Sequence, residues 1–166
     1  MKMMSKRMQA GTSLIEVLVS LLILSVGLLG MVGLQTVSLR NTQTAYLRTQ
    51  ATILSSDIIE RMRANAQGVS AGSYNGATGT LSSACLTATG CSAAALALHD
   101  VAEWRAALGD GLPAGSGLVC LDATPDDGTV ATPACDGAGD NYAVKVWWDG
   151  DRDGVADQRS VVTVHL

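Results

Sequence analysis

The sequence predicts an α+β fold, in which a long N-terminal helix precedes a small head with antiparallel strands. Two observations lead to this class. Residues 14–34 form a long apolar run with a single charged residue, and apolar residues at helical spacing follow it. Near the other end of the chain, two segments with alternating side chains are joined by a short loop rich in Asp and Gly. The 166 residues suffice for one membrane helix and one small domain.

The apolar run has the length of a membrane span. Glu16 is the only charged residue between Leu14 and Leu34. A helix of this length rises about 30 Å, which is the thickness of the hydrocarbon core of a bilayer. The run is preceded by basic residues and by no acid, which predicts that the start of the chain stays in the cytoplasm while the rest leaves it. These basic residues are Lys2, Lys6 and Arg7.

Three other structures fit this segment less well. A Sec signal peptide has a shorter apolar core, of about 7–15 residues, and ends in an A-x-A-like site. A plain signal anchor explains the length and the basic flank but not the acid close to a glycine. A helix buried in a protein core is disfavoured, because a chain of this size rarely encloses so many consecutive apolar positions.

The residues around the acid resemble a processing motif. The run from Gly11 to Val19, GTSLIEVLV, is similar to the cleavage and methylation motif of type IV prepilins and pseudopilins. The resemblance implies that a prepilin peptidase cuts between Gly11 and Thr12, and that Thr12 becomes the N-methylated N-terminus. Glu16 is then the fifth residue of the mature chain. The family commonly has Phe where this chain has Thr12, at a position where the motif is tolerant.

The longer run from Leu14 to Gln35 looks most like that of the minor pilins called the type IV pilus modification protein PilV family, and the resemblance is specific over about residues 11–66. It implies a leader peptide at 1–11, a chain anchored in the bacterial inner membrane with a periplasmic head, and later entry into the extracellular pilus. The expected partners are other minor pilins, the major pilin, the prepilin peptidase and the inner-membrane assembly platform. The expected role is the assembly or priming of the pilus within a tip complex.

Two alternative functions stay open. A minor pseudopilin of a type II secretion system would have the same leader and helix. A membrane-anchored periplasmic domain that binds calcium or acts as an enzyme would keep a fixed helix and an uncut leader. We expect the chain not to be an enzyme. Residues 68–72 match G-x-S-x-G, but a nucleophile elbow needs a strand before it and a helix after it, whereas a helix precedes this run and a loop follows.

Glu16 is expected to act in assembly. A carboxylate in a membrane segment is costly and is usually kept for a function. When helices pack side by side in a filament, the N-terminal amine of a neighbouring chain would pair with this carboxylate in a low-dielectric environment. Such a pair would fix the register of the helices more than it stabilises them, because removing one partner costs more than the pair contributes.

The helix is expected to continue beyond the membrane segment 12–34 as an amphipathic half, residues 35–66. One face carries an apolar stripe at spacings of three and four, formed by Leu47, Ala51, Leu54, Ile58 and Met62. The opposite face is polar and carries Arg48, Gln50, Ser55, Ser56 and Arg63. We therefore expect one helix to about Ala66, whose second half packs under a globular head made of residues 67–166.

The head begins with residues 67–90, which are rich in Gly, Ala, Ser and Thr and predict a loop or short irregular strands. Ser92 is expected to cap a second helix that ends at Gly109, followed by Pro113. The apolar face of this helix is formed by Ala97, Val101, Trp104 and Leu108. His99 lies on the opposite side and is expected to face solvent.

Three strands are expected in the remaining chain, at 117–123, 141–149 and 158–166. In the second, one face carries Tyr142, Val144, Val146 and Trp148, and the other carries Lys145 and Trp147. In the third, Val162, Val164 and Leu166 share a face. A loop joins the last two strands, so they should form an antiparallel hairpin, which agrees with the pilin fold that the resemblance implies.

Four cysteines lie in the part of the chain expected outside the cytoplasm: Cys85, Cys91, Cys120 and Cys135. No two of them form C-x-x-C, so neither a thioredoxin-like motif nor a zinc ribbon is indicated. An oxidising periplasm favours disulfides, and four cysteines allow three pairings. Proximity favours Cys85–Cys91 and Cys120–Cys135, and free buried thiols are the alternative.

The loop of the last hairpin is acidic: Asp149, Asp151, Asp153 and Asp157 follow the pattern D-x-D-x-D-G-x-x-D. Alternate acids before a glycine turn can wrap oxygen ligands around calcium. The closing glutamate of such a loop is missing, because Ser160 occupies its position, and Asp and Gly are favoured in any turn. Calcium is therefore the only cofactor considered, with a plain acidic turn as the alternative.

The charge of the chain bears on its partners. It has 15 acidic and 11 basic residues, for a formal net charge of −4, and the acids concentrate in the C-terminal half. Nucleic-acid binding needs a basic stripe, which this acidic head lacks. We therefore expect no nucleic-acid partner.

Overall fold

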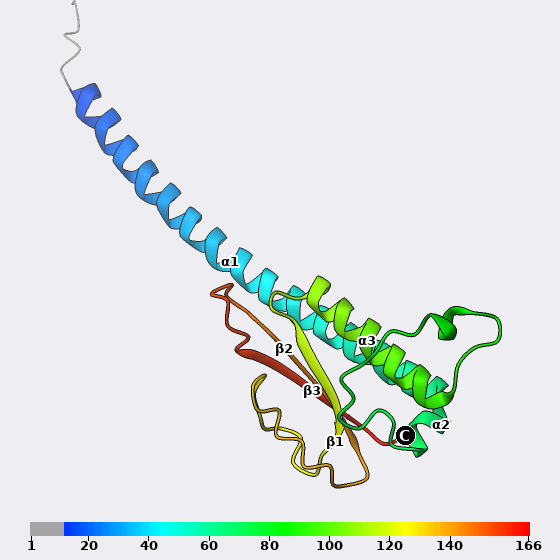
Figure 1. The fold of residues 1–166 in the computed structure, drawn as a ribbon. Helices are drawn as coiled ribbons and strands as arrows, with labels where there is room; N and C mark the ends of the chain where they lie inside the picture. Colours follow the sequence, from blue (N-terminus) through cyan, green and yellow to red (C-terminus); the bar gives the residue numbers. More distant parts are fainter. Residues whose placement is uncertain (1–11) are drawn as a thin grey trace, which may run out of the picture. The chain divides into compact units, whose positions relative to one another are not determined.

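The computed structural model describes residues 12–166 (Figure 1). The predicted leader, which ends at Gly11, lies outside the described residues. The elements are, in order, α1 (Thr12–Ala64), α2 (Ala66–Ser70), the 3-10 helix η1 (Ser83–Leu86), α3 (Ala93–Gly111), β1 (Ser116–Leu121), β2 (Tyr142–Trp148) and β3 (Gln158–Val164). A long helix followed by a small antiparallel sheet confirms the predicted α+β, pilin-like fold. The described chain divides into two compact units, one before and one from Thr44 onward, and α1 contributes to both.

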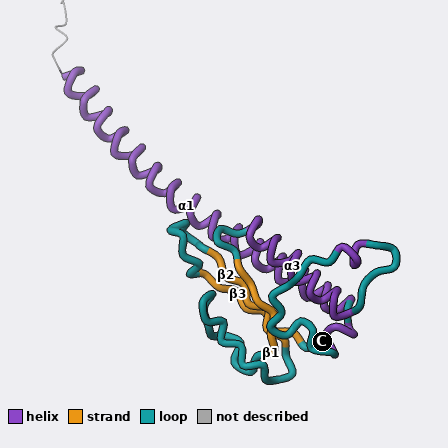
Figure 2. Tube along the Cα trace, viewed as in Figure 1, coloured by secondary structure: helices purple, strands orange, loops and turns teal. Residues whose placement is uncertain are grey.

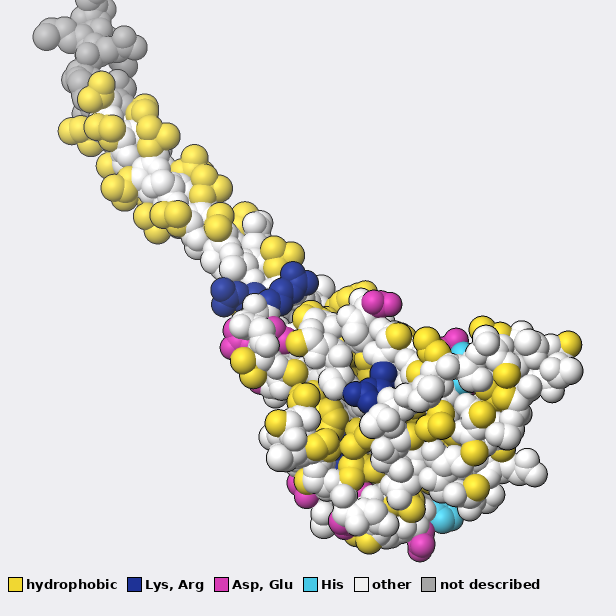
Figure 3. All heavy atoms as spheres, viewed as in Figure 1, with side chains coloured by type: hydrophobic (Ala, Val, Ile, Leu, Met, Phe, Trp, Pro, Cys, Tyr) yellow, Lys and Arg dark blue, Asp and Glu magenta, His cyan; other side chains and the backbone are white. Residues whose placement is uncertain are grey.

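The first unit consists of the part of α1 that precedes Thr44. Its large apolar side chains are all exposed, by between 51% and 75% from Leu14 to Leu39, and they cover the helical surface in Figure 3. Among the described residues, α1 is the one helix long and apolar enough to cross a membrane. Four hydroxyl groups in this part of the helix donate to carbonyls one turn earlier, which satisfies them without water; these are Ser20, Ser25, Thr36 and Thr42.

A single asparagine ends α1 two residues before the predicted boundary. The side chain of Asn65 accepts a hydrogen bond from the backbone N–H of Gly68 (3.1 Å) and thereby caps α2. Its amide also donates to the carbonyl of Ala93 (2.8 Å) and to the hydroxyl of Tyr74 (3.1 Å). Asn65 therefore stops the long helix and joins its end to the start of α3.

The second unit, which we call the head, has one core between two helices and the sheet. The predicted stripe on α1 is confirmed: Leu47, Ala51, Ile58 and Met62 are buried in this core, and Leu54 packs against it. Trp104 of α3 is fully buried, and its indole N–H donates to the Leu54 carbonyl (2.9 Å). Ser55 was predicted on the polar face but is buried as well. Its burial is tolerated because its hydroxyl donates to the Ala51 carbonyl (2.8 Å) and needs no water.

The second helix, α3, begins as predicted and ends later. The Ser92 side chain accepts the N–H of Ala95 (3.2 Å), so the predicted cap is confirmed. The helix passes through Gly109 and runs to Gly111. Among the described residues, nothing outside the backbone of the helix lies within 4 Å of the position that a Cβ of Gly109 would take, so packing does not require a glycine there. The chain leaves the helix at Leu112, which enters the core.

The three strands form one antiparallel sheet in the order β1-β2-β3, and the predicted hairpin of β2 and β3 is confirmed (Figure 2). The observed strands lie within two residues of the predicted boundaries. Val144 of β2 pairs with Val119 on one side and with Val162 on the other. Every residue of β2 is buried, because the core covers one face and the loop between β1 and β2 covers Lys145 on the other.

Both proposed disulfides are present. Cys85 and Cys91, with a Cα–Cα distance of 4.7 Å, close the loop that contains η1. Cys120 and Cys135, with a Cα–Cα distance of 6.1 Å, join β1 to the loop between β1 and β2. No cysteine in the described chain is free, so the alternative of buried thiols is excluded.

Candidate functional site

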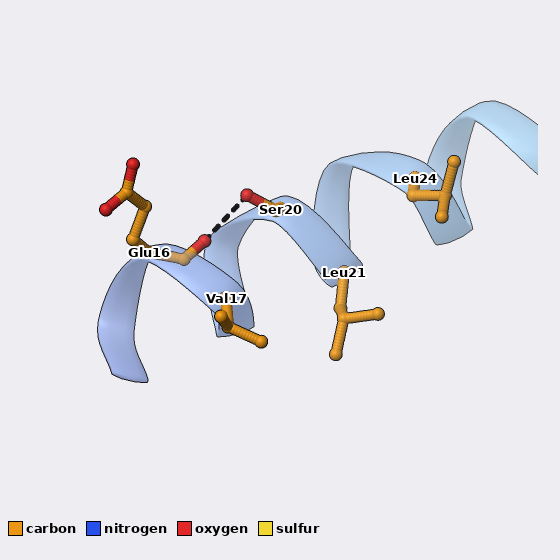
Figure 4. A pocket seen from close by; sticks show the side chains of 5 residues that line it. All are labelled: Glu16, Val17, Ser20, Leu21 and Leu24. Atoms are coloured by element: carbon orange, nitrogen blue, oxygen red, sulfur yellow. Dashed lines mark hydrogen bonds between the residues drawn. The ribbon is translucent and has the colours of Figure 1, made fainter. Parts of the chain in front are cut away.

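The first candidate site is the exposed surface around Glu16 near the start of α1 (Figure 4). Val17, Ser20, Leu21 and Leu24 line a shallow concave surface beside Glu16, and most of this surface is apolar. The Ser20 hydroxyl donates to the backbone carbonyl of Glu16 (2.7 Å), whereas the Glu16 carboxylate projects away from the helix. Among the described residues, no hydrogen bond or ion pair reaches this carboxylate. The helix therefore presents one anionic group on an otherwise apolar surface.

The residues predicted for processing fall at the boundary of the described chain. Gly11 lies outside the described residues, so the predicted cleavage position stays a prediction. Thr12 is the first residue of α1, which places Glu16 four residues along the same helix. An N-terminus that is already helical could present an amine at the end of a neighbouring helix, as the assembly hypothesis requires.

The second candidate site is the acidic loop between β2 and β3. Asp149 is buried, and its two carboxylate oxygens accept the backbone N–H groups of Arg152 (2.6 Å) and Gly154 (2.7 Å). The Asp151 carboxylate accepts the N–H of Asp153 (3.3 Å), and that of Asp153 accepts the N–H of Val155 (2.8 Å). The loop therefore folds around its own carboxylates. Gly154 takes a positive φ of 94°, which a glycine adopts without strain.

Three of the predicted calcium ligands come together and the fourth does not. Asp149, Asp151 and Asp153 each offer an oxygen within 4.8 Å of the others. Asp157 does not belong to this group; it accepts the backbone N–H of Gly150 (3.4 Å) instead. Burial raises the pKa of Asp149, but the backbone N–H groups of Gly154 and its neighbours outweigh this effect and lower the pKa overall. Backbone N–H groups thus stabilise this charge, and calcium binding stays a prediction.

A third polar cluster lies under the loop between β1 and β2, and the sequence did not reveal it. Lys145 of β2 is fully buried and forms an ion pair with the buried Asp122 (Nζ to Oδ2, 2.6 Å). Its ammonium group also donates to the Asp127 carboxylate (3.0 Å) and to the Pro133 carbonyl (2.9 Å). Burial raises the pKa of Asp122, but the hydrogen bond from Lys145 and the N–H of Thr124 lower it overall. This cluster holds the loop against the sheet.

A fourth polar network joins α1 to α3 and corrects one prediction. Arg61 of α1 binds Glu103 of α3 (2.7 Å) and lies 3.6 Å from Asp100. His99 is only 5% exposed, so the expectation that it faces solvent is wrong. The chain returns over this face of α3, and the backbone N–H of Ser82 donates to His99 Nδ1 (3.1 Å). Periodicity along one helix could not show that a distant segment covers its polar face.

Tyr74 completes this network. Its hydroxyl donates to the Asp100 carboxylate (2.6 Å). Burial and this hydrogen bond raise the pKa of Tyr74 well above its ordinary value. The G-x-S-x-G run that precedes it lies in α2 and the turns after it, with the Ser70 hydroxyl donating to the Gln67 carbonyl (3.1 Å). The run therefore lacks the strand that a nucleophile elbow needs before its serine.

Two family models match the chain. One, described as type IV pilin Tt1218, matches residues 33–102. The other, described as the prokaryotic N-terminal methylation motif, matches residues 6–32. The second match covers the predicted cleavage and methylation position together with Glu16, and the first covers the rest of α1 and continues into α3. No curated protein and no solved structure matches the chain significantly.

Proposed function

We propose that this type IV pilin is a minor pilin of the PilV kind, which a prepilin peptidase cuts after Gly11 and which then helps to prime pilus assembly. The observation that carries the proposal is the helix surface around Glu16: one carboxylate without a partner among the described residues, on an exposed apolar helix that the methylation motif covers. Such a surface is compatible with a membrane or with the packed helices of a filament, and with little else.

The proposed sequence of events follows from the chemistry of the helix. While the chain waits in the inner membrane, the apolar part of α1 lies in the bilayer. On extraction, the same side chains pack against the helices of neighbouring pilins, and the amine of a neighbour's N-terminus neutralises Glu16. Other minor pilins, the major pilin and the assembly platform are the partners in this step. The chain contributes binding surfaces and performs no catalysis of its own.

The Glu16 side chain provides the test. We expect Glu16→Ala to leave leader cleavage and the amount of folded chain in the membrane unchanged, and to lower incorporation into sheared pili at least tenfold. Glu16→Asp should restore part of the incorporation, because it keeps the charge on a shorter side chain. Ser25→Ala is the matched control, since it changes an exposed serine of the same helix that does not line this surface, and keeps the carboxylate. Normal incorporation of Glu16→Ala would contradict the proposal.

A minor pseudopilin of a type II secretion system is the second candidate, because the methylation motif and the helix would serve it equally well. The two roles differ in the filament that takes up the chain. Immunoblots of sheared pili, made in parallel from cells without the pilus assembly platform and from cells without the secretion platform, distinguish them. Dependence on the pilus platform supports the proposal, and dependence on the secretion platform alone assigns the pseudopilin role.

A further inference from the structure

The two outer edges of the head's sheet differ in their hydrogen bonding. On β1, the Val119 carbonyl accepts the N–H of Gly76 (2.9 Å), and the Leu121 carbonyl accepts the N–H of Gly137 (3.0 Å). The Leu121 N–H donates to the side chain of Asn75 (2.9 Å). Segments from two loops therefore occupy the outer edge of β1.

These bonds also fix which groups of β3 face outward. In an antiparallel sheet, alternate residues of a strand bond to the neighbour on either side. Because Val119 and Leu121 bond outward, Leu118 and Cys120 bond inward to β2, opposite Lys145 and Ala143. The intervening residues of β2 therefore bond to β3. They pair with Gln158, Ser160, Val162 and Val164.

The remaining residues of β3 direct their N–H and carbonyl groups away from the sheet: Arg159, Val161 and Thr163. Among the described residues, no backbone hydrogen bond from another segment reaches these groups. The outer edge of β3 therefore offers three donors and three acceptors in a regular row. This row has the geometry of a strand that can accept another strand.

The usual protections of an exposed edge are missing from β3. Its seven residues include neither proline nor lysine, which are residues that commonly prevent edge-to-edge pairing. The one charged side chain is turned away from the edge: the Arg159 guanidinium donates to the Asp126 carboxylate (2.8 Å) and to the Gly128 carbonyl (2.9 Å). Val162 and Val164 are only partly buried against the core, so the core is incomplete at this side.

We propose that the outer edge of β3 pairs with an extended edge strand from the head of a different pilin, which adds a fourth strand to the sheet. The proposal rests on the proposed function for the class of its partner. The added strand satisfies the outward groups of β3, and its side chains cover Val162 and Val164. Backbone pairing supplies the affinity, and these two valines select an apolar strand.

A second copy of this chain fits the edge poorly. The outer edge of β1 is already occupied, so a copy cannot offer β1 to β3. In Figure 1, β3 runs in the same direction as the part of α1 within the head. An antiparallel pair of two β3 strands would therefore turn the head helices of two copies in opposite directions. Two chains anchored in one membrane have their helices in the same direction, which excludes this pair. A parallel pair of two β3 strands would place the head helices of the two copies on opposite faces of the joined sheet, so they would not lie side by side as the helices of a filament do. The partner is therefore a different pilin.

Photo-crosslinking in cells that make the full chain tests the pairing. A photoreactive amino acid replaces Thr163, whose side chain is exposed at the edge, and in a matched strain it replaces Asp110, which is exposed near the end of α3. We expect position 163 to crosslink to a strand of another pilin, identified by mass spectrometry of the joined peptides, and position 110 not to. A crosslink from position 163 to a second copy, or none to any pilin, overturns the proposal.

A backbone variant tests the hydrogen bonds themselves. Val161→Pro removes the central outward donor and keeps the bonds to β2, whereas Val161→Ala keeps the donor and shortens the same side chain. We expect Val161→Pro to lower the yield of the crosslink from position 163 roughly tenfold relative to Val161→Ala. Thr163→Pro, with the photoreactive residue at Val161, is the second variant. Formation of both disulfides shows that a variant is folded. If folded proline and control variants give equal crosslink yields, the proposal is overturned.

The edge pairing and the proposed function fail separately. The crosslink is read in whole cells, before and after assembly, and does not require that the chain reach a filament. If Thr12 is not methylated and the chain is missing from pili, the proposed function is wrong whether or not position 163 crosslinks. If the chain enters pili and position 163 crosslinks to no pilin, the edge pairing alone is wrong.

Discussion

The two halves of α1 differ in what covers their apolar side chains. From Leu14 to Leu39 the large apolar side chains stay exposed, whereas Leu47, Ala51, Ile58 and Met62 are buried against α3 and the sheet. One helix thus contains a segment that requires an apolar environment from outside the chain and a segment whose environment the chain itself provides. The second half therefore stabilises the head, whereas the first half is the part to which we assign the proposed role in assembly.

The polar groups follow the same division. Glu16 in the first half is not paired with any described residue, whereas Arg61 in the second half binds two carboxylates of α3 and one of α1 itself, on Asp57. If the comparison holds, changes in the head should lower its stability and leave processing intact. Changes at Glu16 should leave both leader cleavage and the stability of the head unchanged, and should lower incorporation into filaments.

The largest effect on the head is expected from its buried ion pair. Lys145→Met would leave the Asp122 carboxylate buried without its cationic partner, and removing one partner of such a pair costs about 3–5 kcal/mol. The measurement is chemical denaturation of the full chain in detergent, followed by tryptophan fluorescence. The double variant Lys145→Met, Asp122→Asn should recover part of the loss. A single variant as stable as the parent chain would show that this cluster does not hold the loop.

The contribution of each disulfide to the free energy of unfolding should increase with the length of chain that it closes. Their cysteines are 15 residues apart for Cys120–Cys135 and 6 for Cys85–Cys91. In the chain-entropy model, removing the first costs roughly 3 kcal/mol and removing the second roughly 2 kcal/mol. Replacing both cysteines of each pair by alanine, and comparing the free energies of unfolding, tests this order. The reverse order would mean that the loop around η1 contributes more to the head than its contacts indicate.

Low pH should destabilise the head, because it protonates the Asp122 carboxylate. The pKa of this carboxylate is lower in the folded head than its ordinary value near 4. A carboxylate of this kind stabilises the fold above its unfolded pKa, and the contribution is lost as the pH falls through the folded value. We therefore expect the Tm to fall below about pH 4. Asp122→Asn should flatten this fall, and an unchanged acid profile in that variant would contradict the assignment.

The smallest effect is expected from calcium. The acidic loop already satisfies Asp149 through the backbone N–H groups of Arg152 and Gly154, so the plain turn is the favoured of the two alternatives. We expect millimolar calcium to change the Tm of the head little. A calcium-dependent rise that Asp151→Ala abolishes would instead assign a cation site to the loop.

The features of the fold that could be predicted are those that residues close together in the sequence determine. The stripe on α1, the Ser92 cap and the β2–β3 hairpin follow from residues close together in the sequence, and all three are confirmed. The burial of His99 and Lys145 depends on loops that return from elsewhere in the chain. The only signal for the Lys145 cluster was a lone lysine within an apolar strand that follows an acid-rich loop.

The candidate site divides in the same way. The motif at Gly11, Thr12 and Glu16 is a local pattern, and a family model matches the region that contains it. Whether the sheet has an open edge is not a local property, because it depends on where distant loop segments pack: in the described chain they occupy the edge of β1 and not that of β3. The motif was therefore accessible from the sequence, whereas the open edge of β3 was not.

The central claim is that the first half of α1 is a processed assembly element. Mass spectrometry of the N-terminal peptide of the mature chain, isolated from membranes, tests it most directly. We predict a peptide that begins with N-methylated Thr12 and lacks residues 1–11. An intact leader, or cleavage at another position, would contradict the claim and leave α1 as a fixed membrane anchor.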